Sequence, residues 1–403
     1  MKRVLRLAAV VLLAALVFAG CGTTSSFLPE ASPPSVVTGG GNSGAGAEIA
    51  LIGLVEQAET PMWQAVLGTI SWFAGEEGTT YGPYKTTAEE TGFTVDLAVK
   101  GGARVVVVLG TEMADVLQQA QKDYPAVRFI LVDAQGDEAL LSNSAGIRFA
   151  FEQAGWLAGY AAVAEGFTKT AFLQAEDAAA QRYSLGFLLG AEAAGAAGLA
   201  GENHIEARQV DVSGQDESQP VWQERLSSLF ADDTRLVFCS EASVQSEVLS
   251  LARKGGAQVI ATGVATILPQ RSVLTVLEKN PQEALFGLLS RWKAGNFPAG
   301  EILVAGAENG SVSLAIENGE FSVFTKAAYE ALKQQFEDGA LAEALVQATQ
   351  PAEDGTFPEP KSLVLQHVSV MLPVPASAAS SQPQAAQSTV GSSGEGQSTA
   401  EAE

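Results

Sequence analysis

Hydrophobic and polar positions between residues 47 and 372 alternate in blocks that predict strands followed by helices. The run at 104–109 is almost wholly β-branched and apolar, which is typical of a strand buried on both faces of a sheet. The pattern predicts strands at 48–55, 104–109 and 128–132 and helices at 62–76 and 112–122. This alternation indicates an α/β fold with parallel sheets flanked by helices.

A second strand–helix–strand pattern, with strands at 235–239 and 258–260, echoes the one built on 104–109 and 128–132. Any two such units look alike, so the echo indicates similar architecture and not a duplication. Units this far apart in the chain favour two sheets, each with its own core. Open α/β sheets bind ligands at the carboxyl ends of their strands, so we expect two Rossmann-like lobes facing an interlobe cleft.

The first residues have the layout of a secretory signal, with a basic start and an uncharged apolar run at 7–19 that ends in Ala19-Gly20-Cys21. Cysteine after Ala-Gly resembles a bacterial lipobox, which predicts a signal peptide at 1–20 and a lipid on Cys21. The apolar run is shorter than the roughly 20 residues that a membrane-spanning helix needs. An ordinary secretion signal is the alternative. With the lipid, the chain is expected on the extracytoplasmic face of a bacterial cell membrane.

Both ends of the remaining chain have the composition of unfolded segments. Residues 21–46 are rich in Ser, Thr, Pro and Gly and predict a flexible linker, whereas 373–403 have almost no large apolar residues and predict a disordered tail. Losing three basic residues with the signal leaves 20 basic against 46 acidic side chains, a formal charge of −26. This charge argues against a nucleic-acid partner, because phosphates would be repelled.

The chain shows no recognisable catalytic or metal-binding motif. Its two histidines, His204 and His367, lack a second ligand at metal-binding spacing, and no phosphate-binding glycine loop or nucleophile elbow is present. Cys239 lies in an apolar run and is expected to be a small buried residue. We therefore expect neither an enzyme nor a cofactor.

The candidate binding residues follow predicted strands, where a cleft would lie. Asp133 can accept hydrogen bonds from a ligand, Gly110 allows a ligand to approach the backbone, and Thr111 can donate or accept. The alternative for all three is local, namely a tight turn or a helix cap.

Aromatic side chains near the expected cleft offer flat surfaces for a ring-shaped ligand. Trp63 begins a predicted helix, Phe149 and Phe151 lie where the chain would cross to the second lobe, and Tyr183 precedes a glycine-containing helix. The alternative is that each of these rings fills the core or a hinge.

Several segments, taken in order, resemble the basic membrane lipoprotein family, whose members are substrate-binding lipoproteins of ABC transporters. Residues 120–133 resemble its A-x-x-y-P-x-x-x-F-x-x-x-D pattern, and 149–160 resemble its crossover helix. Gly186-Phe187-Leu188-Leu189-Gly190 resembles its G-F-x-x-G helix, and 271–300 follow its late strand and G-x-F-x-x-G turn.

The resemblance implies the type I periplasmic-binding architecture for a body at 47–372. The first lobe would comprise 47–148 with a returning segment at 265–298, and the second 149–264 with 299–330. The family implies capture of a small ligand, a nucleoside first, and delivery to an ABC permease.

The chain departs from the family at several binding positions. The loop Glu56–Trp63 lacks the family's phenylalanine-asparagine pair, so only Trp63 could supply a stacking ring there. Gly263, a further candidate ligand contact, is followed by Val264-Ala265 where the family has valine and aspartate, and the family lysine falls near Glu278. Unpaired ligand groups would cost on the order of 1–3 kcal/mol each. A lipoprotein with a diverged or lost pocket, acting in sensing or protein interaction, is therefore the alternative function.

Overall fold

The computed structural model of the chain describes residues 46–58, 60–136, 138–213, 220–263 and 272–372. The expected signal peptide, Cys21, nearly all of the expected linker and the expected tail lie outside the described residues.

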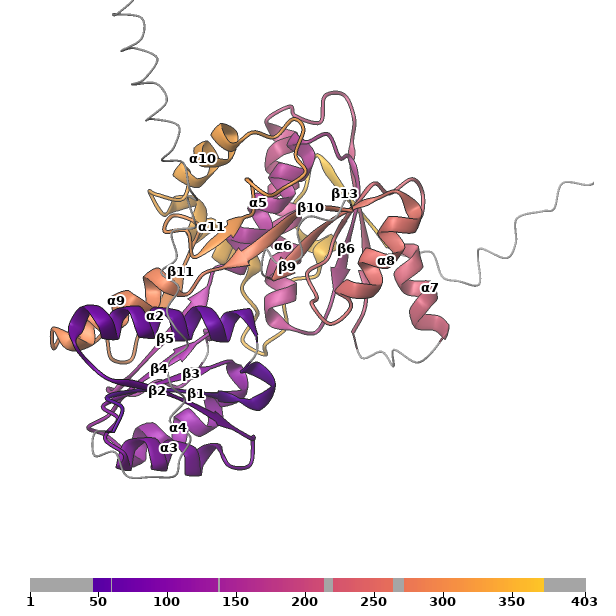
Figure 1. Ribbon diagram of the computed structural model, residues 1–403. Coiled ribbons are helices and arrows are strands. Elements are labelled where there is room, and N and C mark those ends of the chain that lie inside the picture. Colours follow the sequence, from indigo (N-terminus) through magenta and orange to yellow (C-terminus); the bar gives the residue numbers. More distant parts are fainter. Residues whose placement is uncertain (1–45, 59, 137, 214–219, 264–271, 373–403) are drawn as a thin grey trace, which may run out of the picture. The chain divides into compact units, whose positions relative to one another are not determined.

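Six parallel strands form the first sheet, in the order β11-β5-β4-β3-β1-β2 (Figure 1). They are β1 (Ile49–Leu54), β2 (Tyr81–Thr86), β3 (Val105–Leu109), β4 (Arg128–Val132), β5 (Ser144–Phe149) and β11 (Ile302–Ala305). The three strands predicted from the sequence for this region are confirmed. Along β3 the side chains alternate between two cores, with Val105 and Val107 in one and Val106 and Val108 in the other.

Helices cover both faces of the first sheet. The core on one face includes residues of α3 (Thr91–Lys100) and α4 (Ala114–Asp123), and the core on the other includes residues of α2 (Pro61–Glu77) and α9 (Gln282–Lys293). Helix α2 begins where Thr60 accepts a 3.3 Å hydrogen bond from the Trp63 backbone and Pro61 takes the first helical position. It ends at Gly78, whose φ of 62° suits glycine.

Seven strands form the second sheet, in the order β12-β10-β9-β8-β6-β7-β13. They are β6 (Lys169–Gln174), β7 (Ile205–Asp211), β8 (Leu236–Phe238), β9 (Gln258–Gly263), β10 (Val273–Lys279), β12 (Val312–Leu314) and β13 (Val368–Met371). All pairs are parallel except β10 with β12. The two-sheet prediction is confirmed.

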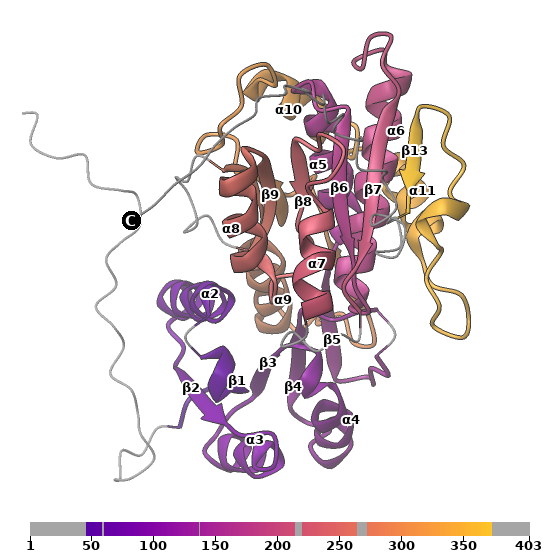
Figure 2. The same cartoon turned by 90° about the vertical axis from the view of Figure 1, so that its right-hand side faces the viewer.

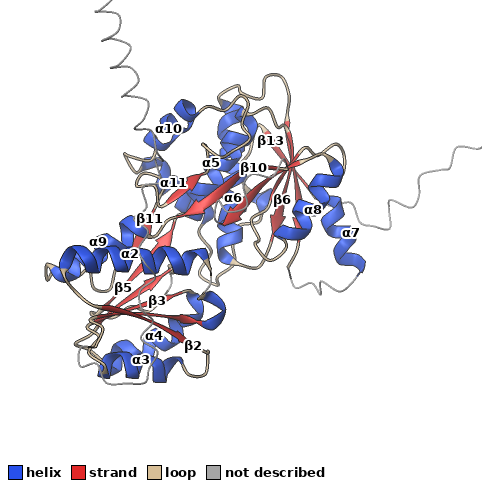
Figure 3. Ribbon diagram, in the orientation of Figure 1, coloured by secondary structure: helices blue, strands red, loops and turns tan. Residues whose placement is uncertain are grey.

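Helices also flank the second sheet (Figures 2 and 3). The core on one face includes residues of α5 (Phe151–Ala164) and α6 (Ala178–Ala196), and the core on the other includes residues of α7 (Pro220–Ser228) and α8 (Gln245–Gly255). Cys239 is buried in the second of these cores, and burial raises the pKa of its thiol to about 12. The prediction that Cys239 is a small buried residue is therefore confirmed.

Helices α5 and α6 approach each other through glycines. An ideal Cβ placed on Gly155 or Gly159 of α5 would overlap the backbone of α6, and one on Gly186 or Gly190 of α6 would overlap the backbone of α5. Backbone atoms cannot move aside as the end of a flexible side chain can. The helices can therefore pack this closely only when these positions lack a Cβ.

The returning segments differ from the expected lobe assignment. Strand β10, expected in the first lobe, pairs with β9 in the second sheet, and β11, expected in the second lobe, pairs with β5 in the first. Helix α9, between them, packs against α2. The assignment was wrong for these two strands because apolar runs of similar composition do not reveal which sheet edge they join.

The C-terminal part of the described chain lies against the second sheet. Helices α10 (Lys326–Gln334) and α11 (Ala340–Thr349) lead towards β13, which pairs with β7. The Glu192 carboxylate of α6 accepts hydrogen bonds from the backbone amides of Gln366, His367 and Val368 at 2.9, 2.8 and 3.1 Å. None of the helices that the structure describes is long and apolar enough to cross a membrane.

Candidate functional site

A cavity of about 280 Å³ is lined by residues that follow strands of both sheets. The first sheet contributes the last residue of β3 and residues after β1, β3, β4 and β5, and the second contributes residues after β6 and the last residue of β10. The lining residues are Gln57, Thr60, Met62, Leu109, Gly110, Thr111, Glu112, Asp133, Gln135, Phe151, Asp177, Ala179 and Lys279. This is the carboxyl edge at which α/β sheets bind ligands.

An ion pair joins the two sheets at this cavity. Lys279, at the end of β10, donates a 2.7 Å hydrogen bond from Nζ to Oδ2 of Asp133, which follows β4. Oδ1 of Asp133 is buried and has no hydrogen-bond partner among the described residues. Asp133 also has a φ of 72°, a conformation that aspartate adopts more readily than most residues. The carboxylate therefore has an acceptor left for a ligand.

Aromatic rings surround the ammonium group of Lys279. Its Nζ lies 5.5 Å from the ring centroid of Phe149 and 5.2 Å from that of Phe151, distances typical of cation–π contacts. The ring of Tyr183 packs against that of Phe151, with the two ring centroids 4.8 Å apart. Burial, and then the negative charge of Asp133, raise the pKa of the Tyr183 hydroxyl, so this ring stays neutral.

Gly110 and Thr111 form the turn after β3 at the cavity. Gly110 has a φ of 89°, and a Cβ there would overlap the side chains of Glu112 and Gln57. Those two side chains are joined by a 3.3 Å hydrogen bond from Gln57 Nε2 to Glu112 Oε2. Glycine thus allows a polar wall to form next to Thr111.

Among the described residues, carboxylates outnumber ammonium groups in the cavity lining, which contains Glu112, Asp133 and Asp177 but only Lys279 as a cation. Asp177 also caps α6 by accepting a 2.8 Å hydrogen bond from the Ala180 amide. This balance suits a neutral or cationic ligand and disfavours an anion. Within the described residues, no group of three or more His, Cys, Asp or Glu side chains could hold a metal ion.

The remaining candidate residues do not line the cavity. Trp63 is buried in the core with its ring against Gly53, and its neighbour Met62 lines the cavity instead. Phe149 and Tyr183 are buried behind Phe151 and Lys279. Gly263 ends β9 with a φ of 131°, and the residues after it lie outside the described part.

Sequence reasoning missed Lys279 and expected a reversed charge at Glu278. That expectation is wrong: Glu278 lies near Ser313 of β12, whose hydroxyl is 3.5 Å from its carboxylate, whereas Lys279 faces the cavity. Successive side chains of a strand point to opposite faces. Placing the family lysine one residue too early therefore put a carboxylate where the structure has a cation. Gln57 and Asp177 were also missed, although both follow strands.

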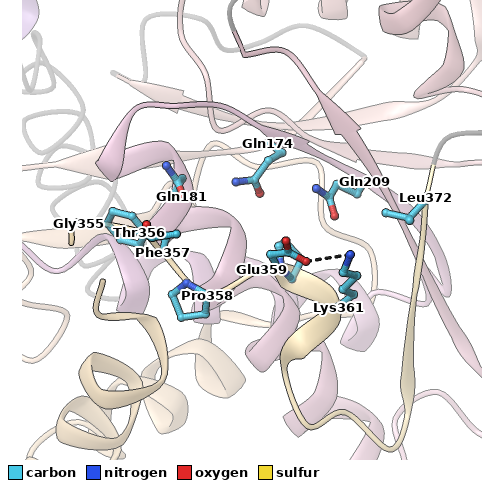
Figure 4. A pocket seen from close by; sticks show the side chains of 11 residues that line it. Gln174, Gln181, Gln209, Gly355, Thr356, Phe357, Pro358, Glu359, Lys361 and Leu372 are labelled. Carbon is cyan, nitrogen blue, oxygen red and sulfur yellow. Dashed lines mark ion pairs between the residues drawn. The ribbon is translucent and has the colours of Figure 1, made fainter. Parts of the chain in front are cut away.

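Larger cavities lie elsewhere. One of about 400 Å³ is formed where residues 355–361 cross the end of the second sheet, with Gln174, Gln181 and Gln209 opposite the Glu359–Lys361 ion pair (Figure 4). Its lining comes from the second sheet, α6 and the C-terminal segment, with nothing from the first sheet. We therefore place the candidate ligand site at Asp133 and Lys279.

The resemblance seen in the sequence is confirmed by a family model. The model of the PnrA-like substrate-binding proteins of ABC transporters (Bmp) matches residues 74–198, a stretch that includes Gly110, Thr111 and Asp133. No curated protein sequence matches the chain significantly.

Solved structures show the same fold at low sequence identity. A solute-binding protein of an ABC transporter system from Aeropyrum pernix is 16% identical with a TM-score of 0.51, covering 74% of this chain and 90% of that one. One from Conexibacter woesei is 16% identical with a TM-score of 0.54, covering 73% and 97%. A transcriptional activator of the comK gene from Bacillus halodurans is 17% identical with a TM-score of 0.55, covering 78% and 100%.

The fold is thus shared by transport proteins and a regulator, so fold alone does not define the role. The described body has the type I periplasmic-binding fold, and residues 74–198 of the chain are similar to the PnrA-like substrate-binding proteins of ABC transporters.

Proposed function

We propose that this chain is a lipid-anchored solute-binding protein on the extracytoplasmic face of a bacterial cell membrane, which captures a small ligand and delivers it to an ABC permease. The observation that carries the proposal is the Asp133–Lys279 pair, which joins the carboxyl edges of the two sheets at one cavity. A ligand that binds there contacts both sheets, and such contacts can drive closure of the sheets around it.

A nucleoside is the first ligand to test. The free Oδ1 of Asp133 can accept a hydrogen bond from a ribose hydroxyl, and Phe151 offers an aromatic edge beside it. The excess of carboxylates disfavours the phosphate of a nucleotide. The cavity of about 280 Å³ lies just below the range of about 300–1,000 Å³ for ligand sites. A nucleoside therefore enters when the sheets move apart and Lys279 releases Asp133.

The test is thermal unfolding of the purified protein with adenosine, guanosine, inosine, cytidine, uridine and the matching monophosphates. A nucleoside at a hundred times its dissociation constant should add about 2.7 kcal/mol to the unfolding free energy, and the monophosphates should add less. Asp133→Asn should abolish this gain in unfolding free energy. The substitution keeps the shape of the side chain and the tolerance for a positive φ.

The matched control is Lys326→Met, which removes the exposed Lys326–Glu317 ion pair far from the cavity residues in the chain. It should leave the nucleoside effect unchanged. If no nucleoside stabilises the protein, nucleoside capture is ruled out, and the alternative of a lipoprotein with a lost pocket becomes the better account. If Asp133→Asn binds as well as the unaltered protein, the ligand does not use this cavity.

The membrane attachment has a separate test. Replacing Cys21 with serine should move the protein from the membrane fraction to the soluble fraction of an expressing bacterium, because the lipids on that cysteine supply the anchor. Mass spectrometry of the N-terminal peptide should show the added acyl mass on Cys21. An unmodified Cys21 in membrane-bound protein would contradict the proposal.

A further inference from the structure

A cavity of about 460 Å³ lies between α2, α9 and the turn at 309–311, and we call it the Trp72 cavity. It shares no lining residue with the cavity at Asp133. Helices α2 and α9 pack side by side here (Figure 1), and the backbone amide of Asn280 donates a 2.8 Å hydrogen bond to the Ser311 carbonyl oxygen. The volume is within the range of about 300–1,000 Å³ that small-molecule sites occupy.

An exposed tryptophan forms one wall of this cavity. Trp72 is 48% exposed, although the next residue, Phe73, is fully buried. The Trp72 ring packs against Phe286 of α9 with ring centroids 4.4 Å apart and an interplanar angle of 32°, so its orientation is fixed. A rigid ring that remains half exposed offers a flat surface with a negative π face.

Residues with side-chain amides, namely Asn280, Gln282 and Asn309, also line this cavity. Oδ1 of Asn280 accepts a 2.9 Å hydrogen bond from the backbone amide of Gln282. Oδ1 of Asn309 accepts one of 3.1 Å from the backbone amide of Ser311. With each oxygen engaged in its own turn, the amide nitrogen of each asparagine is oriented as a donor. Glu283 adds a carboxylate acceptor at the rim. The cavity thus combines fixed donors with an acceptor.

Ser311 supplies an independent sign of a missing ligand. Ser311 is one of the residues that line the cavity and is only 1% exposed, yet its buried Oγ has no hydrogen-bond partner among the described residues. A buried hydroxyl without a partner costs roughly 1–3 kcal/mol, so such groups are ordinarily satisfied. A ligand group that reached Ser311 Oγ from the cavity would supply the missing partner.

We propose that the Trp72 cavity is a carbohydrate-binding site. The C–H groups on one face of a pyranose carry partial positive charge and suit the negative face of the indole. Sugar hydroxyls both donate and accept, which matches the two asparagine amides, the Ser311 hydroxyl and the Glu283 carboxylate. Among the described residues, the lining contains no Lys or Arg, which disfavours an anionic ligand.

The experiment is titration of the purified protein with methyl β-glucopyranoside, N-acetylglucosamine, cellobiose and trehalose, followed by calorimetry and saturation-transfer NMR. At least one saccharide should bind with a dissociation constant below about 1 mM, and the NMR signal should come from the C–H protons of one sugar face. Trp72→Ala should weaken that binding at least about tenfold, as expected when an aromatic surface is lost.

Asn309→Asp is the second variant, chosen because it keeps the oxygen that accepts from the backbone amide of Ser311 and replaces the NH₂ donor with a negatively charged acceptor oxygen. It should weaken the same saccharide several-fold without a change in melting temperature. Phe93→Ala is the matched control, since Phe93 is an exposed aromatic residue of α3 that does not line the cavity. It should leave saccharide binding unchanged, and so should Asp133→Asn.

Three results would overturn the proposal. The first is no binding by any of the four saccharides, and the second is binding that Trp72→Ala and Asn309→Asp leave intact. The third is binding that Asp133→Asn abolishes, which would assign the sugar to the other cavity. Failure of the nucleoside experiment would leave this proposal standing, because it concerns different residues.

Discussion

Two ion pairs near the meeting of the sheets differ in burial, and the difference separates structural from binding groups. Arg148 of β5 holds Glu152 of α5 through two parallel 3.1 Å hydrogen bonds, with side chains only 7% and 0% exposed. Lys279 holds Asp133 through one hydrogen bond, with side chains 26% and 23% exposed. The Arg148–Glu152 pair is closed, meaning that it is buried and out of reach of a ligand. In the Lys279–Asp133 pair, either residue can exchange its partner for a ligand.

The comparison teaches that charge alone does not identify a functional pair. Removing one member of a buried pair leaves a charge without water or a partner, so the fold depends on keeping both. A partly exposed pair contributes little to stability because water screens it.

The largest effect is expected for Arg148→Met, which leaves the Glu152 carboxylate buried and unpaired. The unfolding free energy should fall by about 3–5 kcal/mol in urea denaturation. Adding Glu152→Leu should restore most of the loss, because the second change removes the unpaired charge. A single variant as stable as the parent would show that water reaches Glu152.

A closed region should also resist added volume. Gly190→Ala places a methyl group where the Trp156 carbonyl oxygen of α5 now lies, so the helices must separate, at a cost of about 3 kcal/mol. Gly68→Ala in α2 is the control, because a Cβ there meets nothing within 4 Å. The control should gain up to about 1 kcal/mol from higher helix propensity. Equal melting temperatures for the two variants would contradict the packing seen here.

A carboxylate of intermediate exposure should have an intermediate, pH-dependent effect. Burial opposes ionisation of Glu192, but hydrogen bonds from His367 and from the backbone amides of Gln366 and His367 outweigh it and lower the pKa of its carboxyl below 4.5. A lowered folded pKa gives stability that is present above the unfolded value and is lost as the pH falls through the folded one.

Glu192→Gln should therefore cost about 1–2 kcal/mol at neutral pH, since it replaces hydrogen bonds to a charge with weaker ones. Unfolding free energies measured across the acid range should converge for variant and parent as the pH falls below the ordinary carboxyl value. A gap that stays constant to the lowest pH would mean that the charge of Glu192 does not matter.

The smallest stability effect is expected for Lys279→Met. Its pair with Asp133 is partly exposed, so the unfolding free energy should change by about 1 kcal/mol or less. The same urea experiment that shows a large loss for Arg148→Met supplies the scale. A loss as large as that of Arg148→Met would place the cavity pair among the structural groups and contradict the contrast.

Periodicity was sufficient to predict several strands and the edge at which the cavity lies. The strand predicted at 128–132 coincides with β4, and Gly110, Thr111 and Asp133, all chosen because they follow strands, line one cavity. These features follow from local patterns, because β-branched runs form buried strands and parallel strands present their carboxyl ends together.

Which of two neighbouring side chains faces the cavity could not be predicted in the same way. Met62 lines the cavity where Trp63 was expected, and Lys279 faces it where Glu278 was considered. Both errors are of one residue, because the rotation of a helix and the facing of a strand end depend on contacts with distant segments. Lys279 and Asp133 are 146 residues apart, so no local pattern pairs them.

The backbone at Asp133 has a consequence for how this protein can change. A left-handed φ costs an ordinary residue roughly 1–2 kcal/mol, and glycine escapes that cost. Glycine at this position would relax the chain and erase the acceptor in a single step. Selection for thermal robustness and selection for ligand capture would thus act in opposite directions on one codon.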